Sequence, residues 1–356
     1  MPKDMRYYIE RQGEALSHAI ETAAETCAPF VRLWKEARPD RLYLVGSGTS
    51  GNAACAAAPG MAAWLGAEVT AVTPTSLPSQ VQGKPLFVFI SQGGQSTNTV
   101  RAIEKISGRW PSLALTGEEV CRINGLLPHV VLTCGHEEAG PKTMGYTCTI
   151  LTLYLMALAV SPLPGAEKDA VLQALRGMAQ DLPENIAAVD TWLSAGADAV
   201  SQAAYWAIAG TGTGREVARE AALKLQETLL RPAMGFEFEE YLHGPSMMLA
   251  ENGAALGGMY LLPAKARADR PRVEALSELH AGFGSPVVVV GAGERASAEG
   301  NRLTLKAGEE AWLEPFWQIL PSQCMGALLP ERLGLAGKGH RVFQMIDKAV
   351  GVKCKN

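Results

Sequence analysis

Short apolar segments alternate with segments of helical spacing along the first half of the chain. Runs rich in Val, Leu, Ile and Phe predict buried strands, and apolar residues three and four positions apart predict the helices between them. Strands that are apolar on both faces and separated by helices are typical of a parallel sheet covered on both sides. This half is therefore predicted to be a doubly wound α/β domain, with strands at 41–46, 68–72, 85–91, 111–116 and 129–134 and helices at 5–36, 51–66 and 98–106.

A long helical zone follows at 142–195, and the Pro and Gly residues of 161–165 interrupt it. The alternation of strands and helices then restarts. The second half is predicted to contain strands at 205–210, 254–262 and 286–291 and helices at 214–229 and 273–284.

The restart is visible in two glycine-rich turns. Placing residues 46–50 (GSGTS) over 210–214 (GTGTG), a shift of 164 positions, puts each turn after its predicted strand and before its predicted helix. A period of this length is too long for a solenoid and indicates a duplicated domain. We therefore expect two α/β domains, each a doubly wound parallel sheet flanked by helices, at 1–160 and 196–356, joined by a helical connector at 161–195.

Composition and charge narrow the class of protein. The 356 residues include 32 basic and 36 acidic side chains, a formal net charge of −4, and the scattered basic residues argue against nucleic acid or an anionic membrane as partner. No uncharged apolar run reaches the roughly 18 residues of a membrane span, and the opening MPKDMRYYIERQGEAL lacks the apolar core of a signal peptide. A cytoplasmic location is therefore expected. The seven cysteines are spread without a CxxC pair, which indicates neither a disulfide framework nor a metal site.

The first glycine-rich turn, at 46–51, has the GxGxxG pattern and the placement of a dinucleotide fingerprint. The acid that binds ribose is missing, because Glu68 stands at the beginning of the second strand rather than at its end. No Lys follows the last glycine, which excludes a P-loop. The remaining features, backbone N–H groups at a helix N-terminus and the hydroxyls of Ser47, Thr49 and Ser50, suit a phosphate without a nucleotide. The alternative is that these hydroxyls only cap the helix.

A second hydroxyl-rich turn, SQGGQST at 91–97, follows the strand at 85–91 and again precedes a helix. Both turns therefore open at the carboxyl edge of the predicted sheet, where ligands of open α/β sheets bind. Two such turns, with Ser, Thr and Gln rather than Arg, predict a site for a phosphate attached to a polyol. Helix capping is the alternative here as well.

The segments VGSGTSGNAA and FISQGGQSTNTVRAI resemble the sugar isomerase (SIS) domain family. The two-domain layout is similar to the isomerase half of glucosamine-6-phosphate synthase, and most similar to fructoselysine and glucoselysine 6-phosphate deglycases. The resemblance implies that Gly93 stands where the family has a serine, so that Ser96 or Thr97 has to supply the missing hydroxyl. The phosphate-binding residues that it implies, together with their neighbours in the two turns, are Ser47, Thr49, Ser50, Ser91, Gln92, Gly93 and Ser96.

Only the first copy is expected to hold the sugar phosphate. The loop of the second copy has Gly214 where the first has Ser50, and its later strand ends in LLPAKAR without an SQ turn.

Candidate acid–base groups lie in the second half. Lys224 and Glu227 share a face of the helix predicted at 214–229, and His243 follows after a short stretch predicted to be irregular. From spacing alone, a solvated surface pair is the alternative. The segments KLQE and EEYLHGP resemble the KLKE and ELKHGP segments of the synthase. The resemblance implies that Glu227 is the general base that moves a proton between C1 and C2, and that His243 assists ring opening.

Further residues are assigned near His243 and in the segment before the long helical zone. Glu239 and Glu240 either orient His243 or belong to a solvated surface. The segment HEEAGPKTMGYTCT at 136–149 resembles a sugar-lining segment of the family. The substrate-lining residues expected are Glu138, Lys142, Thr143 and Lys224.

The synthase also forms a Schiff base through a Lys near its C-terminus. The tail KAVGVKCKN of this chain contains no recognisable copy of that motif, so that a surface tail is the alternative for Lys348, Lys353 and Lys355.

The sequence therefore predicts an enzyme that cleaves an amine-bearing sugar 6-phosphate into sugar phosphate and free amine. An aldose–ketose isomerase or deaminase acting on glucosamine 6-phosphate is the first alternative, and a non-catalytic phosphosugar sensor is the second. A glutaminase is not expected, since no Cys stands beside the initiating Met. The expected partner is a small-molecule sugar phosphate, with no cofactor, metal, nucleic acid or membrane. The resemblance also implies a homodimer or a higher homo-oligomer, in which a neighbouring subunit can donate His243.

Overall fold

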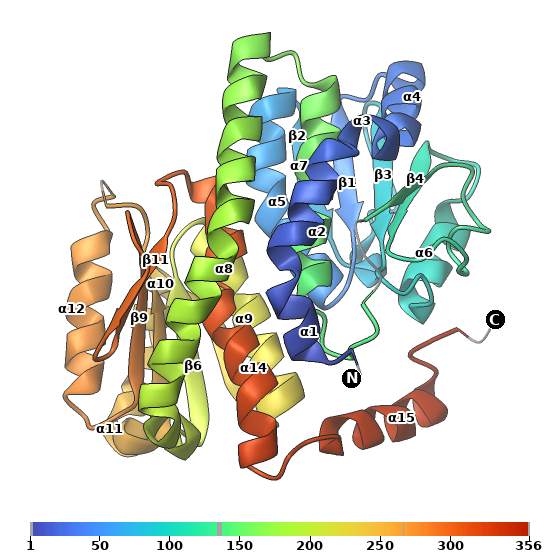
Figure 1. Ribbon diagram of the computed structural model, residues 1–356. Coiled ribbons are helices and arrows are strands. Elements are labelled where there is room, and N and C mark those ends of the chain that lie inside the picture. The colour runs from blue at the N-terminus through green and yellow to red at the C-terminus, as the bar shows by residue number, and fades with distance from the viewer. Residues whose placement is uncertain (1–2, 134–136, 266, 355–356) are drawn as a thin grey trace. The chain divides into compact units, whose positions relative to one another are not determined.

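The computed structural model describes residues 3–133, 137–265 and 267–354 (Figure 1). The chain forms two compact units, which we name after the first strand of each sheet. The β1 unit comprises Glu14–Glu138, Lys142–Arg176 and His340–Asn356, and the β6 unit comprises Met1–Gly13, Ala139–Pro141 and Gly177–Gly339. The N-terminal segment thus belongs to the unit of the second sheet and the C-terminal segment to the unit of the first. The domain boundaries expected at 160 and 195 stay a prediction.

The β1 unit is built on a five-stranded parallel sheet with the strand order β2-β1-β3-β4-β5. Leu42 of β1 lies between Val69 of β2 and Leu86 of β3, so the apolar runs pair in register. All five strands of this sheet were expected from the sequence. They are β1 (Arg41–Val45), β2 (Glu68–Val72), β3 (Pro85–Ile90), β4 (Ser112–Thr116) and β5 (Val130–Leu132).

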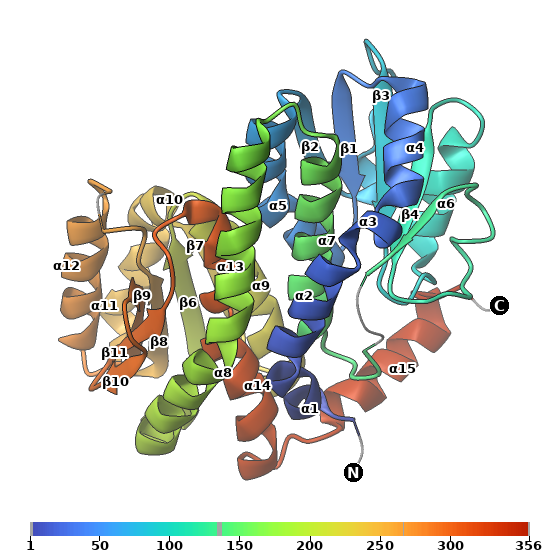
Figure 2. The same cartoon turned by 45° about the horizontal axis from the view of Figure 1, so that its top comes forward.

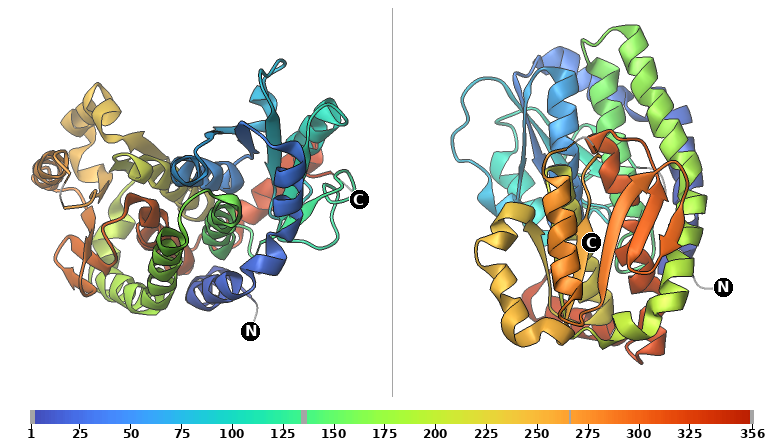
Figure 3. Two further views of the ribbon diagram at one scale, coloured as in Figure 1. Left: turned by 90° about the horizontal axis from the view of Figure 1, so that it is seen from above. Right: turned by 90° about the vertical axis from the view of Figure 1, so that its left-hand side faces the viewer.

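Helices cover both faces of this sheet. In the sheet, β2 lies on one side of β1, whereas β4 lies on the opposite side of β3. The two crossover connections therefore run in opposite directions. Because both are right-handed, their helices α5 (Thr49–Leu65) and α6 (Thr97–Ile106) lie on opposite faces of the sheet (Figure 3). The apolar helix α7 (Met144–Val160) packs against α5 and is buried along nearly its whole length. The fold class expected for this half is confirmed.

The expected helix at 5–36 is divided into four. Thr22 directs both its N–H and its hydroxyl to the carbonyl of His18, and Pro29 stands in the first turn of the last helix. Proline lacks the N–H that a continuous helix would need, so a new helix starts there. The segments are α1 (Met5–Glu10), α2 (Gln12–Glu21), α3 (Ala23–Thr26) and α4 (Ala28–Ala37).

The β6 unit is built on a six-stranded sheet with the order β10-β11-β9-β8-β6-β7. Its strands are parallel except for β10, which pairs with β11 in the antiparallel sense at the edge. The sheet is therefore mainly parallel, as expected. Its strands are β6 (Tyr205–Gly210), β7 (Ala233–Glu237), β8 (Leu256–Leu261), β9 (Val287–Gly293), β10 (Ser297–Glu299) and β11 (Arg302–Lys306).

The expectation of an irregular stretch between residues 229 and 243 is wrong. This stretch contains the edge strand β7 and the short helix α10 (Phe238–Leu242). Met234 of β7 is exposed, as an edge strand permits, so the segment lacks the continuous apolar run that identified the central strands.

Two helix layers enclose the second sheet. Helix α9 (Thr213–Leu229) packs against β6, β7 and α14 (Leu320–Arg332), whereas α12 (Arg270–Ala281) lies against β8 and β9 on the other face (Figures 1 and 3).

Arg6 of α1 joins this unit through two hydrogen bonds of 2.7 and 2.6 Å to the Asp190 carboxylate. The remaining helices are α8 (Gly165–Gln202), α11 (Leu249–Asn252), α13 (Glu314–Trp317) and α15 (Lys338–Val350).

Within the described ranges, no helix combines the length and the apolar character that crossing a membrane requires.

A buried histidine limits the size of one strand residue in the β6 unit. His280 is hydrogen-bonded to the Tyr260 hydroxyl and to the Leu256 carbonyl, both at 2.8 Å, and burial lowers the pKa of its imidazole. A Cβ at Gly258 would lie 2.6 Å from the His280 Nδ1 atom. We expect Gly258→Ala to lower the free energy of unfolding by about 1–3 kcal/mol, because the ring must move away from its partners.

Urea denaturation measures this loss. Gly177→Ala is the matched control, because Gly177 is a helical glycine around which an added Cβ meets no atom within 4 Å. It should be neutral or slightly stabilising. Equal stability of the Gly258→Ala protein and the parent would contradict the steric argument.

Candidate functional site

The first glycine-rich turn joins β1 to α5 at very short range. A Cβ at Gly46 would lie 2.9 Å from the backbone carbon of Ser50, and one at Gly51 would lie 2.9 Å from the Gly46 oxygen. Gly48 has a φ of +56°, which favours glycine. The glycines of the pattern therefore allow the end of β1 to lie against the first turn of α5, so that α5 begins directly at the carboxyl edge of the sheet.

The second copy repeats this backbone geometry. Gly212, 164 residues after Gly48, also has a φ of +56°, and a Cβ at Gly210 would lie 2.5 Å from the Gly214 oxygen. The duplicated turn expected from the sequence is confirmed.

The second hydroxyl-rich turn lies beside the first in the β1 unit. The Asn98 amide donates a 2.8 Å hydrogen bond to the Ser47 hydroxyl and so links the two turns. The Ser91 and Ser96 hydroxyls are 3.3 Å apart. Ser96 occupies the N-cap position of α6, but its side chain makes no capping hydrogen bond. The capping alternative therefore does not hold for Ser96, and the Ser91–Ser96 pair lies between the carboxyl end of β3 and the N-terminus of α6.

The side chains of Gln92 and Thr97 are engaged inside the β1 unit. The Gln92 amide donates to the Gly145 carbonyl at 2.8 Å and to the Thr149 hydroxyl at 2.7 Å, which ties the end of β3 to the start of α7. The Thr97 hydroxyl donates to the Gly351 carbonyl at 2.6 Å. Of the two hydroxyls expected to compensate for Gly93, that of Ser96 therefore lies beside Ser91, whereas that of Thr97 bonds the C-terminal segment.

Glu137 is the buried acid of the segment before α7, and sequence reasoning missed it in favour of Glu138, which is exposed. Its carboxylate accepts hydrogen bonds from the Thr143 and Gly145 N–H groups at 2.9 and 2.8 Å and from the Thr143 hydroxyl at 2.8 Å. Burial raises the pKa of Glu137 above its ordinary value, although these hydrogen bonds oppose the rise. The Lys142 amino group bonds the Glu137 carbonyl. An acid shortly before an apolar helix was the available signal, since carboxylates stabilise helix N-termini.

Three charged side chains of α9 form a compact group in the β6 unit. The Lys224 ammonium lies 2.6 Å from Glu227 Oε2 and 3.3 Å from Glu220 Oε1. Lys224 and Glu220 are completely buried, whereas the Glu227 side chain is 36% exposed. Burial lowers the pKa of Lys224, but the two carboxylates outweigh burial and raise it above the ordinary value. The solvated-pair alternative is therefore wrong for Lys224, and Glu227 is the member of the group that solvent reaches.

Sequence reasoning also missed Glu220. It stands four residues before Lys224, and the rule that paired Lys224 with Glu227 applies equally to this spacing.

His243 is exposed at the end of α10, directly before Gly244 and Pro245. Glu239, one of the two acids expected to orient it, instead pairs with Arg272 of α12. Glu240 is exposed. Of the tail lysines, Lys348 and Lys353 are exposed, and Lys355 lies outside the described residues.

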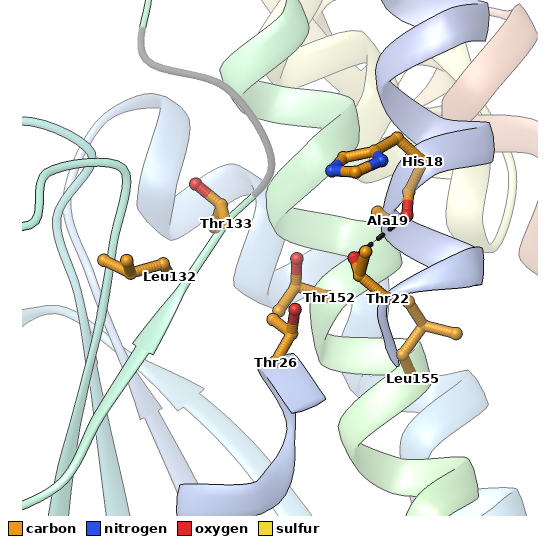
Figure 4. A pocket seen from close by; sticks show the side chains of 8 residues that line it. All are labelled: His18, Ala19, Thr22, Thr26, Leu132, Thr133, Thr152 and Leu155. Carbon is orange, nitrogen blue, oxygen red and sulfur yellow. Dashed lines mark hydrogen bonds between the residues drawn. The ribbon is translucent and has the colours of Figure 1, made fainter. Parts of the chain in front are cut away.

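A separate cavity of about 220 Å³ occurs in the β1 unit beside α2, β5 and α7 (Figure 4). None of the site residues expected from the sequence lines it. Its polar groups include the Thr22 hydroxyl, which already donates to the His18 carbonyl, and the Thr152 hydroxyl, which donates to the Cys148 carbonyl. The lining residues are His18, Ala19, Thr22, Thr26, Leu132, Thr133, Thr152 and Leu155.

Comparison with known proteins identifies the architecture. No family model matches the chain. Over 226 residues, or 59% of this chain, it is 29% identical to the glutamine–fructose-6-phosphate aminotransferase (isomerizing) of Tropheryma whipplei, of which it covers 35%. The chain thus spans less than half the length of the curated relatives that it matches, for example 35% in this case and 49% for the enzyme of Streptococcus pneumoniae.

Solved structures give the same result. A protein of Clostridium difficile 630, provisionally assigned as a phosphosugar isomerase, superposes with a TM-score of 0.81 at 21% identity over 93% of both chains. The C-terminal domain of the Francisella tularensis glucosamine-fructose-6-phosphate aminotransferase gives 0.78 at 18% identity and covers 93% of this chain and 96% of that domain. The chain has the fold of phosphosugar isomerases. More particularly, the expected resemblance to the double-SIS family, and to the isomerase half of glucosamine-6-phosphate synthase, is confirmed.

Proposed function

We propose that this protein cleaves an amine-bearing sugar 6-phosphate into sugar phosphate and free amine. The proposal rests on the paired hydroxyls of Ser91 and Ser96 at the carboxyl edge of the sheet in the β1 unit. Asn98 links this second hydroxyl-rich turn to Ser47 of the first glycine-rich turn. Backbone N–H groups and hydroxyls at two helix N-termini suit a phosphate ester. The curated relatives named as aminotransferases of fructose 6-phosphate support this substrate class.

Proton transfer is assigned to Glu227. A substrate that carries its amine on C1 and a carbonyl on C2 can lose a proton from C1 to the carboxylate and regain it at C2. The N–H proton passes to the C2 oxygen, so that the C1 amine becomes an imine while the C2 carbonyl becomes a hydroxyl. Water then adds to the C=N bond, its oxygen stays on C1, both of its protons pass to the nitrogen, and the C–N bond breaks to give the free amine and the aldehyde of the sugar phosphate. Since Glu227 is the exposed member of its charged group, it can meet a substrate, whereas Lys224 acts as a positioning residue that holds its carboxylate.

A Schiff base with the protein is not part of this proposal. Lys224 is buried between two carboxylates and its raised pKa keeps it as an ammonium, which is not a nucleophile. The substrate supplies its own amine, so none is needed from the chain. His243 is assigned to ring opening, as the family resemblance implies. The cytoplasmic location and the homo-oligomer also stay predictions.

Removal of two hydroxyls tests the phosphate site. We expect Ser50→Ala combined with Ser91→Ala to weaken binding of glucose 6-phosphate by about a hundredfold or more and to change glucose binding little, because each hydrogen bond to an anion contributes roughly 1.5–3 kcal/mol. Isothermal titration calorimetry measures both affinities. Thr213→Ala, at the equivalent turn of the second copy, is the matched control and should have no effect. Equal losses for both ligands would show that the hydroxyls are structural.

Substrate trials test the reaction itself. Lysine-, aspartate- and ammonia-bearing sugar 6-phosphates are supplied in turn, and the release of sugar phosphate and of free amine is followed. Release from an amino-acid adduct supports the proposal. Turnover restricted to glucosamine 6-phosphate would favour the isomerase or deaminase instead, and tight binding without turnover of any of them would favour a sensor.

A further inference from the structure

The segment after α15 pairs with the second hydroxyl-rich turn of the β1 unit. Ser96 and Lys353 face each other in an antiparallel bridge. The Thr97 N–H donates to the Val352 carbonyl at 3.1 Å, and the Cys354 N–H donates to the Gln95 carbonyl at 2.8 Å. Figures 1 and 2 show the chain rising from α15 to the N-terminal end of α6. Main-chain hydrogen bonds on both sides therefore fix residue 353 against residue 96.

This pairing sets the side on which the Lys353 side chain lies. In an antiparallel pair, residues directly opposite each other project their side chains from the same face. Ser96 carries the hydroxyl that stands 3.3 Å from that of Ser91. The Lys353 side chain is exposed, and its main-chain N–H is held by a 2.7 Å hydrogen bond to the Asp347 carboxylate. A flexible four-carbon stem thus starts beside the hydroxyl pair.

The two turns lack any charge that would balance a phosphate. Residues 46–51 and 91–97 contain no Lys, Arg or His, whereas a phosphate monoester carries a charge of about −1.5 to −2 at pH 7. The second turn also has Gly93 where a further hydroxyl was expected. A cation supplied by another segment would compensate for both deficits.

We propose that Lys353 is a phosphate-binding residue whose ammonium pairs with the anion held at the Ser91–Ser96 turn. The inference rests on the proposed function, in that it takes this turn as the phosphate site. It assigns to the C-terminal segment a role in substrate binding rather than in covalent chemistry.

The test compares three full-length variants by titration calorimetry with glucose 6-phosphate and with glucose. Lys353→Gln keeps the backbone bridge and removes the charge, and is expected to weaken glucose 6-phosphate binding by about tenfold, the effect of one charged hydrogen bond. Lys353→Arg keeps the charge and should bind nearly as the parent does. Lys105→Gln removes another exposed cation, in the last turn of α6, and is the matched control, without effect.

Steady-state kinetics, with a substrate that the enzyme cleaves, give a second measurement. Lys353→Gln should raise KM about tenfold and leave kcat within twofold, because the charge acts on binding and not on proton transfer. The dependence of binding on salt should also weaken in this variant, since an exposed ion pair is screened.

The outcomes separate the inference from the proposed function. If the parent binds glucose and glucose 6-phosphate equally, the phosphate site itself is wrong. If the parent prefers glucose 6-phosphate and Lys353→Gln retains that preference in full, only the role of Lys353 is overturned. A sugar trapped on Lys353 by borohydride would likewise overturn it, in favour of a Schiff base.

Discussion

Glu227→Gln is expected to reduce amine release from a 6-phosphorylated sugar–lysine adduct by at least the order of 10²-fold, the contribution of a general base. Glutamine has nearly the same shape, and its amide oxygen can still accept the hydrogen bond from the Lys224 ammonium, 2.6 Å from the present carboxylate oxygen. The amide cannot take a proton from C1. Binding of the sugar phosphate should therefore persist while turnover falls.

Steady-state release of lysine measures the effect, and glucose 6-phosphate titration checks that binding survives. Glu278→Gln removes an exposed carboxylate from α12 of the same unit and is the matched control, with turnover unchanged. Undiminished turnover in Glu227→Gln would remove this residue from the mechanism and leave only its structural pairing with Lys224.

Lys224→Met should destabilise the β6 unit by about 3–5 kcal/mol, because it removes one partner of a buried ion pair. Glu220, completely buried, would lose the ammonium that lies 3.3 Å from its carboxylate. Methionine fills a similar volume, so the loss comes from the uncompensated charge rather than from a cavity. Chemical denaturation followed by circular dichroism measures the change.

Two further variants separate charge from packing. The double substitution Lys224→Met with Glu220→Leu removes both buried charges and should recover most of the lost stability. Lys306→Met is the matched surface control, because Lys306 is 39% exposed in its pair with Asp181, and removal of an exposed ion pair should leave the stability nearly unchanged. A single Lys224→Met variant as stable as the parent would show that the buried pair adds nothing.

The central strands of both sheets could be predicted because each is apolar on both faces over five or six residues. The edge strand β7 could not, since its exposed side includes Met234 and its pairing with β6 comes from residues more than 20 positions away. A different reason applies to the single helix expected at 5–36. Its helical spacing is genuine, and two of the three interruptions depend on local features, the Thr22 hydroxyl and Pro29, rather than on hydrophobic periodicity.

The candidate site shows the same contrast. Spacing on α9 correctly placed Lys224 and Glu227 together, but a row of charged residues on a helix has the pattern of a solvated face. In the structure, α9 packs against β7 and α14, and Lys224 and Glu220 are buried rather than solvated. Likewise, the adjacent acids Glu137 and Glu138 are indistinguishable in sequence, and only the position of the α7 N-terminus selects Glu137 as the buried partner.

The sequence by itself determined the α/β class, the duplicated glycine turn and the hydroxyl-rich edge of the first sheet, because these depend on local periodicity and on backbone contacts within a few residues. Tertiary structure alone decided which charges are buried and that the segment around Lys353 pairs with the turn around Ser96. The buried charges and this pairing both arise from contacts between segments that are far apart in the sequence, and the sequence of one segment does not specify such a contact. Whether a residue is buried or paired depends on which distant segment packs against it. Hydrophobic periodicity describes only the segment that contains the residue, so it does not identify that distant segment.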